Sequence, residues 1–213
     1  MHGEREHLFA DYLTISGTSE SESRVKGSLF IGIALPCVTE SDIQSNLSEV
    51  SRRYPNATHY CYAAVYGGTL RTEKSSDNGE PSGTAAKPIL SVIKGRELTD
   101  TMVVVVRYFG GTFLGTGGLV HAYTQSASDA IECASIVKRQ ACAIFRIILS
   151  YADLNTFNAK CRGLCAVPPE IVYEETVAVT AAVPVGRAEE FAQSVADATE
   201  RRARTERIGD GYR

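Results

Sequence analysis

Hydrophobic and polar positions in the first 66 residues predict two strands on either side of a helix. The apolar run 29–35, closed by Pro36, is typical of a strand. A helix follows, because apolar residues recur every three to four positions at Ile43, Leu47, Val50 and Tyr54. Ser41 and Gln44 have the spacing of a capping box at the start of this helix. The aromatic and β-branched residues of 57–66 predict the second strand.

The next part of the chain predicts a loop, a short helix, a buried strand and a longer helix. Residues 67–84 are polar and predict a long connection. Residues 85–95 have helical character, which Pro88 restricts to a first turn. The apolar run 101–109 indicates a strand covered on both faces. After a glycine-rich stretch, one helical face is formed by Val120, Tyr123, Ala127, Ile131 and Ala134.

The remaining residues predict strands and helices in the order β-α-β-β-α-β. A strand over 143–151 precedes a helix that Pro168 and Pro169 must end. Residues 170–183 predict a hairpin, and 203–208 a weak last strand. The two helices are marked by Leu154, Phe157, Cys161 and Leu164, and by Ala188, Phe191, Val195 and Ala198. This order is typical of the ferredoxin-like fold. We therefore expect two domains, 1–138 and 139–213.

Composition and charge make the chain an ordinary soluble globular protein, with 44% hydrophobic and 22% charged residues. Residues 1–140 carry 13 basic and 15 acidic side chains, and residues 141–213 carry 9 and 10. Neither part has the positive excess of a basic nucleic-acid module. The N-terminus is polar and no apolar stretch is long enough for a membrane span. We expect a cytoplasmic protein with reduced cysteines, no cofactor and no bound metal.

Two glycine-rich segments, 76–88 and 107–119, are the strongest candidates for chemistry. Glycines 110 and 111 allow a sharp turn after the strand. Glycines 115, 117 and 118 precede a helix whose free N–H groups favour a phosphate or carboxylate. The hydroxyls of Ser82, Thr84 and Thr116 can cap helices or donate hydrogen bonds. Turn geometry with close packing, and an anion site, both remain possible interpretations.

Neither of the common nucleotide-binding motifs is complete in the second segment. Gly110 and Gly115 have the Walker A spacing, but Thr116–Gly117 replaces the required Lys-Ser/Thr pair. The dinucleotide fingerprint also fails, because Val120 stands where the third glycine belongs.

The charged and nucleophilic candidates each have a structural and a functional interpretation. Arg107 either packs its stem and pairs with a nearby acid, or reaches a phosphate or an acidic partner. Asp77 and Glu80 either form a turn or bind Mg²⁺. His59 or His121 could act as a base for Cys61 or for a serine. The tyrosine row 60, 62 and 66 either stacks bases, forms a protein interface or packs in a core.

The two glycine-rich segments together resemble the Impact family, through "SDNGEPSGTAAKPIL" (76–90) and "VVVVRYFGGTFLGTGGLVHAY" (103–123). The resemblance covers residues 10–135. It implies an α+β protein whose first domain has the βαβ fold of elongation factor G domain IV and of a ribosomal protein. The tail resembles the ferredoxin-like domain of bacterial members. Leu29 and Phe113 stand where the family often has arginine and lysine, which lowers the expectation of charge-driven nucleic-acid binding.

The resemblance to eukaryotic Impact implies a role in translational control. We therefore expect a non-enzymatic regulatory or binding protein, with RNA or a ribosome-associated protein as partner and no membrane association. The alternative is a protein that binds a phosphate-like anion or a nucleotide, or a hydrolase, at the helix start 115–118. The expected binding residues are Arg107, Gly110, Gly111, Gly115, Thr116, Gly117, Gly118, Glu80, Ser82, Gly83, Thr84 and Lys87. The resemblance also implies that the loops 76–84 and 107–118 lie together.

Overall fold

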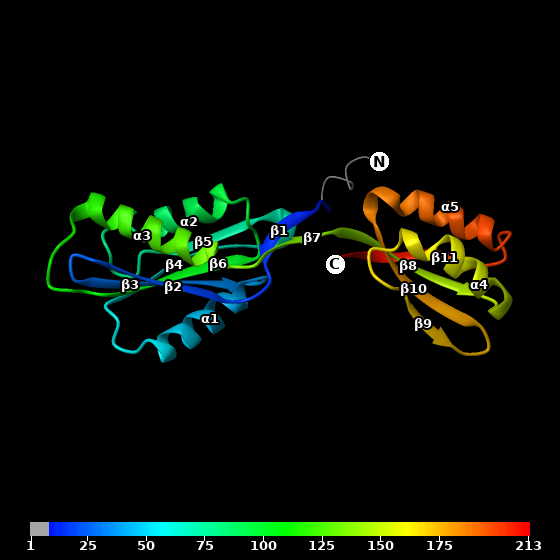
Figure 1. The fold of residues 1–213 in the computed structure, drawn as a ribbon, viewed down its shortest axis with the longest axis horizontal. Coiled ribbons are helices and arrows are strands. Elements are labelled where there is room, and N and C mark those ends of the chain that lie inside the picture. The colour runs from blue at the N-terminus through cyan, green and yellow to red at the C-terminus, as the bar shows by residue number, and fades with distance from the viewer. Residues whose placement is uncertain (1–8) are drawn as a thin grey trace. The chain divides into compact units, whose positions relative to one another are not determined.

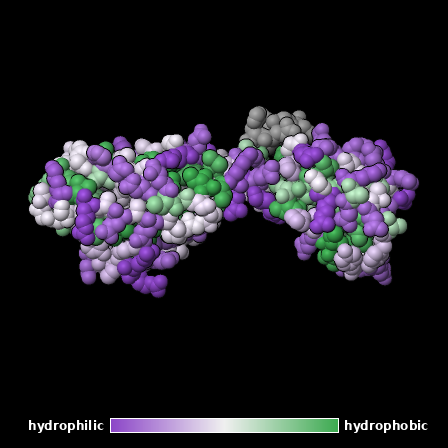
Figure 2. Space-filling view, viewed as in Figure 1, coloured by the Kyte–Doolittle hydropathy of each residue, from purple (hydrophilic) through white to green (hydrophobic). Residues whose placement is uncertain are grey.

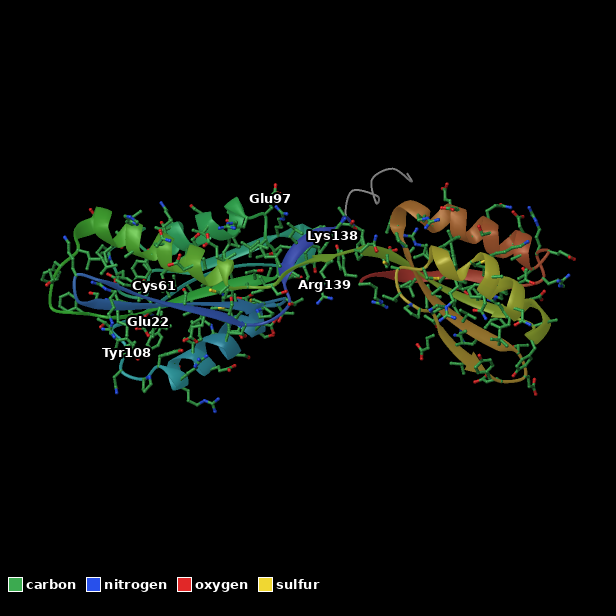
Figure 3. All side chains as sticks on the ribbon, in the orientation of Figure 1. Glu22, Cys61, Glu97, Tyr108, Lys138 and Arg139 are labelled. Carbon is green, nitrogen blue, oxygen red and sulfur yellow. The ribbon has the colours of Figure 1, made fainter. Side chains whose placement is uncertain are left out.

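The structure, a computed structural model, describes residues 9–213, which fall into two compact units (Figure 1). The N-terminal unit spans Tyr12–Lys138. The C-terminal unit contains Arg139–Arg213 together with the described residues up to Asp11. Lys138 and Arg139, on either side of the boundary, are labelled in Figure 3. No helix within residues 9–213 has the length and apolar character needed to cross a bilayer.

The N-terminal unit is built on a five-stranded sheet in the order β2-β3-β6-β4-β5, with every neighbouring pair antiparallel. Its strands are β2 (Ser19–Val25), β3 (Ser28–Pro36), β4 (His59–Tyr66), β5 (Thr72–Ser76) and β6 (Thr101–Tyr108). Its helices are α1 (Glu40–Arg53), α2 (Ala86–Gly95) and α3 (Gly115–Glu132). A separate two-stranded sheet pairs β1 (Tyr12–Ile15) with β7 (Ile136–Arg139).

Both faces of this sheet are covered, so β6 is buried on each side. Helices α2 and α3 cover one face and α1 covers the other (Figure 1). Val103 and Val105 belong to the core under α2 and α3, while Val104 and Val106 belong to the core under α1. The prediction of a strand covered on both faces is therefore confirmed. Tyr62 is buried in the core on the α1 side, and Tyr60 and Tyr66 pack against that core, which supports the packing interpretation of this row.

Helix α3 lies unusually close to the sheet. A Cβ atom placed on Gly32 of β3 would lie 2.2 Å from the carbonyl oxygen of Ser126, so only glycine fits there. Most of the predicted apolar face is buried, but Val120 is 39% exposed. The preceding residue, Leu119, packs on the sheet instead, because α3 begins at Gly115 and residue 120 is turned about 100° further round the helix.

Three local predictions in this unit need correction. The capping box of α1 uses Thr39 and Asp42 rather than Ser41 and Gln44, since the helix begins two residues earlier. The polar connection 67–84 contains a 3₁₀ turn, η2 (Gly68–Leu70), and the edge strand β5. Helix α2 extends for ten residues, because Pro88 lies in its first turn, where no N–H is needed.

The C-terminal unit has the expected β-α-β-β-α-β order. It consists of β8 (Ala141–Leu149), α4 (Tyr151–Lys160), β9 (Glu170–Tyr173), β10 (Val177–Pro184), α5 (Ala188–Ala198) and β11 (Arg204–Tyr212), with 3₁₀ turns η3 (Arg162–Leu164) and η4 (Val185–Arg187). The sheet order β11-β8-β10-β9, with antiparallel neighbours, is that of a ferredoxin-like fold. Both helices cover one face, over a core that contains Phe145, Phe157 and Phe191. Strand β11 is longer than predicted.

Candidate functional site

A cavity of about 450 Å³ lies at one end of the N-terminal unit, where the two glycine-rich segments meet. It is lined by Thr58, His59, Gly79, Glu80, Pro81, Arg107, Phe109, Phe113, Leu114, Gly115, Thr116 and Leu119. These residues come from the ends of β4 and β6, from the two loops that carry the glycines, and from the start of α3. The structure thus brings the segments 76–84 and 107–118 together, as expected from the sequence.

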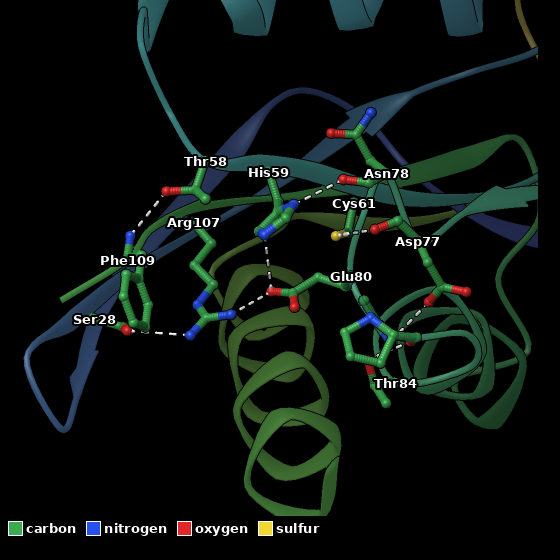
Figure 4. Close-up of polar contacts among 12 residues, drawn as sticks. Ser28, Thr58, His59, Cys61, Asp77, Asn78, Glu80, Thr84, Arg107 and Phe109 are labelled. Carbon is green, nitrogen blue, oxygen red and sulfur yellow. Dashed lines mark hydrogen bonds and ion pairs between the residues drawn. The ribbon is translucent and has the colours of Figure 1, made fainter. Parts of the chain in front are cut away.

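The floor of the cavity is a buried ion pair between Arg107 and Glu80 (Figure 4). Arg107 Nη1 lies 2.5 Å from Glu80 Oε1, and the two side chains are only 5% and 3% exposed. Tyr123 donates its hydroxyl proton to the same oxygen at 2.7 Å. His59 Nε2 lies 3.8 Å from it. Removing one partner of such a pair would leave an uncompensated buried charge, which is strongly destabilising.

The Arg107 guanidinium is held on all sides by the protein itself. It lies between the rings of Phe30 and Phe109, with its Cζ atom 5.4 and 5.5 Å from their centroids. Its Nη2 group donates to Ser28 Oγ at 3.3 Å. Of its three nitrogens, Nε alone has no hydrogen-bond partner among the described residues, and it is buried. Of the two interpretations of Arg107, pairing with an internal acid is the one the structure supports.

Two further groups behind the ion pair are held in their neutral forms. Burial raises the pKa of the Cys61 thiol to about 12, and also raises the pKa of the Tyr123 hydroxyl well above its usual range. The thiol lies 3.0 Å from the Asp77 carbonyl oxygen and 3.3 Å from the Tyr123 hydroxyl. At neutral pH Cys61 is therefore a buried thiol rather than a thiolate, which argues against a nucleophile activated by His59.

Asp77 has a structural role as the cap of α2. Its carboxylate accepts hydrogen bonds from the backbone N–H groups of Gly83, Ala85 and Ala86, at 2.8, 3.0 and 2.8 Å. Burial acts to raise the pKa of Asp77, but these three amides outweigh it and lower the pKa below its ordinary value. With Glu80 paired to Arg107, both carboxylates considered for Mg²⁺ already have partners within the fold.

The start of α3 forms one rim of the cavity and is open. Leu114 occupies the N-cap position, and no side chain among the described residues caps the helix. The first backbone N–H groups of a helix have no partner within it. Gly115 and Thr116 line the cavity at this point. The helix start therefore offers hydrogen-bond donors and a partial positive charge at the cavity rim.

Two aromatic rings stand beside this rim. Phe113 is 88% exposed and Phe109 is 40% exposed, and their ring centroids are 5.3 Å apart. The loop that carries them connects β6 to α3, at the end of the unit on the left in Figure 1. Hydrophobic residues reach the surface at this end of the unit (Figure 2). The exposed rings and the open helix start together form a surface with both apolar and hydrogen-bonding character.

The expected binding residues divide between the cavity and its surroundings. Four of them line it: Glu80, Arg107, Gly115 and Thr116. Four lie on the same loop or helix without lining it: Gly110, Gly111, Gly117 and Gly118. The other four, Ser82, Gly83, Thr84 and Lys87, lie around the start of α2 and do not line the cavity.

Gly110 has a packing role that the sequence left open. A Cβ atom there would lie 1.9 Å from the backbone carbon of Gly27, in the turn between β2 and β3. The Gly110 N–H also donates to Ser28 Oγ. Gly110 thus fixes the loop after β6 against the neighbouring turn, so that close packing explains this glycine.

Several cavity residues were absent from the expected set. They are Thr58, His59, Gly79, Pro81, Phe109, Phe113, Leu114 and Leu119. The position of His59 was readable in principle, because strand alternation places it on the same face as Cys61 and opposite Arg107 on the neighbouring strand. The apolar residues of the cavity wall could not be identified from the sequence, because phenylalanine and leucine are more often core residues than binding-site residues.

Comparisons with known proteins agree on one family. The model of the Impact N-terminal domain matches residues 26–131, a range that includes every residue lining the cavity. IMPACT family member YvyE of Bacillus subtilis is 36% identical over 170 residues, covering 80% of this chain and 78% of its own. IMPACT family member YigZ of Escherichia coli is 32% identical over 159 residues, covering 71% and 75%.

A solved structure described as that of a hypothetical protein shares the fold across the chain. It has a TM-score of 0.67 and 28% identity, and the match covers 95% of this chain and 99% of that one. The α+β fold expected from the sequence is thereby confirmed. Together with the family model and the two bacterial relatives, this shows that the chain belongs to the Impact family.

Proposed function

We propose that this protein is a non-enzymatic, translation-linked binding protein that contacts RNA on or near the ribosome. The contact is made by the glycine-loop surface, which we define as residues 79–81 and 109–117. The resemblance to eukaryotic Impact, a protein of translational control, supports the proposed link to translation. A ribosome-associated protein is the alternative partner at the same surface.

The observation that carries this proposal is the exposed pair Phe109 and Phe113 beside the uncapped start of α3. Aromatic rings on a protein surface stack with unpaired bases, and every base has a face that can stack. Backbone N–H groups at a helix start bind phosphate oxygens. A single-stranded RNA segment offers both groups within one nucleotide, which matches the chemistry of this surface.

The polar groups behind the surface favour binding over catalysis. Glu80 already accepts hydrogen bonds from Arg107 and Tyr123, and Cys61 is protonated. A general base or a nucleophile needs a free lone pair directed at a substrate. The hydrolase alternative therefore receives less support from these contacts than the binding role.

Charge predicts how the interaction should respond to salt. The net charge is −3, and the guanidinium of Arg107 is paired internally. Few phosphates can therefore be neutralised, and each phosphate contact on a single strand contributes about −0.7 to the slope of log K against log salt. We expect a slope of about −1, much shallower than that of a protein with a basic binding stripe.

The test compares Phe113→Ala with Leu70→Ala. Leu70 is a suitable control because it is 74% exposed in the same unit and does not line the cavity. Loss of one stacking ring costs about 1–3 kcal/mol, so Phe113→Ala should weaken RNA binding about 5- to 150-fold. Fluorescence anisotropy with a labelled single-stranded RNA and co-sedimentation with ribosomes measure this, and Leu70→Ala should match the wild type in both.

Three results would count against the proposal. The first is that the wild-type protein binds neither RNA nor ribosomes at low salt, where phosphate contacts are strongest. Phe113→Ala could bind as tightly as the wild type, so that the surface is not the contact. Ribosome co-sedimentation that survives ribonuclease treatment and occurs without binding to isolated RNA would assign the surface to a protein partner instead.

A further inference from the structure

The C-terminal unit has one sheet face that neither of its helices covers. Helices α4 and α5 both pack on the opposite face, over the core that contains Phe145 (Figure 1). Side chains alternate between the two faces along each strand, so every second residue of β8 lies on the uncovered face. We call this the open sheet face, and its residues are Ile144, Arg146, Ile148, Glu170, Val172, Ala178, Thr180, Arg204 and Glu206.

Apolar side chains form a continuous stripe on the open sheet face. Ile144, Ile148 and Ala178 are half-buried by their neighbours, and Val172 is 45% exposed. Ile148, Ala178 and Val172 lie in register on three adjacent strands. A contiguous exposed apolar surface with polar residues around it is typical of an interaction site.

The charges on the open sheet face balance one another and are incompletely paired. Arg146 and Arg204 stand against Glu170 and Glu206, so the face has no net charge. Arg204 lies 3.7 Å from Glu206, with side chains 83% and 60% exposed, and Arg146 has no ion-pair partner among the described residues. The face therefore lacks the positive excess that nucleic acid requires, and it has no aromatic ring for stacking bases.

The positions of these charges fit a second copy of the same face. Across the strands, Arg204 lies beside Ile148 and Glu206 lies beside Arg146, in two adjacent rows. These four side chains line a groove of about 290 Å³. A two-fold axis that crosses the strands between the two rows turns each row onto the other.

This symmetry brings unlike groups together. Arg204 meets Glu206 of the second copy, and the aliphatic stem of Arg146 covers Ile148 of the second copy. Each contact occurs twice, because a two-fold interface uses the same patch on both subunits. An apolar centre that includes arginine is also the usual composition of a protein interface.

We propose that the open sheet faces of two copies pack against each other and form a dimer, with Arg204 paired to Glu206 of the second copy. The proposal is independent of the proposed function, because the glycine-loop surface belongs to the N-terminal unit. Four strands about 4.8 Å apart, with at most nine residues rising about 3.3 Å each, give a face of about 570 Å² or less. A standard interface buries about 800 Å² per partner, so we expect a dimer that dissociates on dilution.

The test follows the mass of the full-length protein by sedimentation velocity, from about 1 μM to about 500 μM, a range that covers weak association. Arg204→Glu and Glu206→Arg each place like charges opposite one another across the axis. Arg162→Glu is the matched control, because it makes the same change of charge at an exposed position of η3, outside the open sheet face. We expect the wild type and Arg162→Glu to dimerise equally.

Each of the two face variants should dimerise at least about tenfold more weakly than the wild type, since like charges in an interface repel. An equimolar mixture of Arg204→Glu and Glu206→Arg should recover the dimer, because the two acidic groups of one variant then face the two basic groups of the other. Recovery on mixing also shows that each variant is folded, so that weak association of the separate variants is an effect at the interface.

Four results would overturn the proposal. The wild type stays monomeric up to the highest concentration, or both face variants dimerise as tightly as the wild type. The third is that the mixture fails to recover the dimer. The fourth is that Arg204→Glu, but not Arg162→Glu, loses binding to single-stranded RNA while every variant is monomeric, which would assign the open sheet face to nucleic acid.

Discussion

The glycines around β6 and α3 look alike in the sequence but have different physical roles. Gly110 is required by space, because its α-carbon lies against the backbone of Gly27. Gly111 and Gly115 are required by conformation, with φ of +82° and +72° and no neighbour that would block a side chain. Gly117 is required by neither. The stability of the fold therefore depends on some of these glycines and not on others.

Alanine substitutions at Gly110 and Gly117 should have opposite consequences. Gly110→Ala forces a methyl group into the Gly27 turn and should lower the free energy of unfolding by about 1–3 kcal/mol or more, as overpacking does. Gly117→Ala should leave it unchanged or raise it by up to about 1 kcal/mol, because alanine is the better helix former. Urea titration followed by circular dichroism measures both.

The pair of variants serves as its own control, since the chemical change is the same in each. An unchanged stability of Gly110→Ala would mean that the β2–β3 turn moves aside easily. A clear loss of stability in Gly117→Ala would reveal a structural need for glycine at that position.

For Arg107, the sequence indicates the face of the strand on which it lies but not the residue with which it pairs. Strand alternation puts Arg107 on the same side as Val103 and Val105, and its contact with Phe30 lies on that side. Its partner Glu80 lies 27 residues earlier, in a loop whose path no periodicity describes. Pairing across such a distance depends on the tertiary fold, so the sequence left both interpretations of Arg107 open.

Among the secondary-structure elements, α2 depends on a residue outside it. Asp77 precedes the helix by nine residues, yet its carboxylate binds three N–H groups at and before the helix start. Capping by a side chain of this kind contributes about 0.5–2 kcal/mol. The same interaction closes the loop 77–85 and so positions Glu80 at the cavity floor.

The contribution of Asp77 to the stability of the fold should decrease as the pH falls. Its pKa is lowered in the folded protein from an ordinary value of 3.8, so the unfolded chain takes up the proton first as the pH falls. The stabilisation is complete when the pH is above the ordinary pKa of 3.8. It is lost as the pH falls through the lower pKa that Asp77 has in the folded protein. Asp77→Ala should therefore be less stable by about 0.5–2 kcal/mol at pH 7, with a difference that shrinks below about pH 4.

Urea titrations of Asp77→Ala and of the wild type between pH 7 and pH 3 check this expectation. Glu49→Ala, which removes an exposed carboxylate from α1, controls for the general change in charge. A difference between Asp77→Ala and the wild type that stays constant over the whole pH range would show that the carboxylate charge plays no part in capping α2.

Two of the strands that the sequence failed to predict share one property. Strand β2 reads SESESRV and strand β5 reads TEKSS, both almost entirely polar. They form the two edges of the five-stranded sheet, where the backbone pairs on one side only. Hydrophobic periodicity identifies a strand by its buried face, so polar edge strands give little signal. The central strands β3, β4 and β6 carry that signal and were predicted.

For the molecule as a whole, the hydrophobic residues form separate cores. The two clusters on either face of the five-stranded sheet contain residues from the N-terminal unit, and the cluster around Phe191 contains residues from the C-terminal unit. A change in one core should therefore be felt first within its own unit.

Phe191→Ala provides the test, because its side chain is fully buried between Phe145 and Phe157. Such a truncation costs about 3–5 kcal/mol. Amide hydrogen exchange should show reduced protection in β8 and β10, with the protection of β6 unchanged. An equal loss of protection in β6 would mean that the two units unfold as one.

The order of strands in the N-terminal sheet also affects how the chain can fold as it is synthesised. Strand β6 lies between β3 and β4, although both are completed more than 30 residues before it. Until residue 108 has left the ribosome, β3 and β4 each lack a permanent neighbour along one edge. Their apolar residues are then open to wrong pairing with other chains. Synthesis of this domain therefore includes an interval in which the inner edges of the unfinished sheet are exposed.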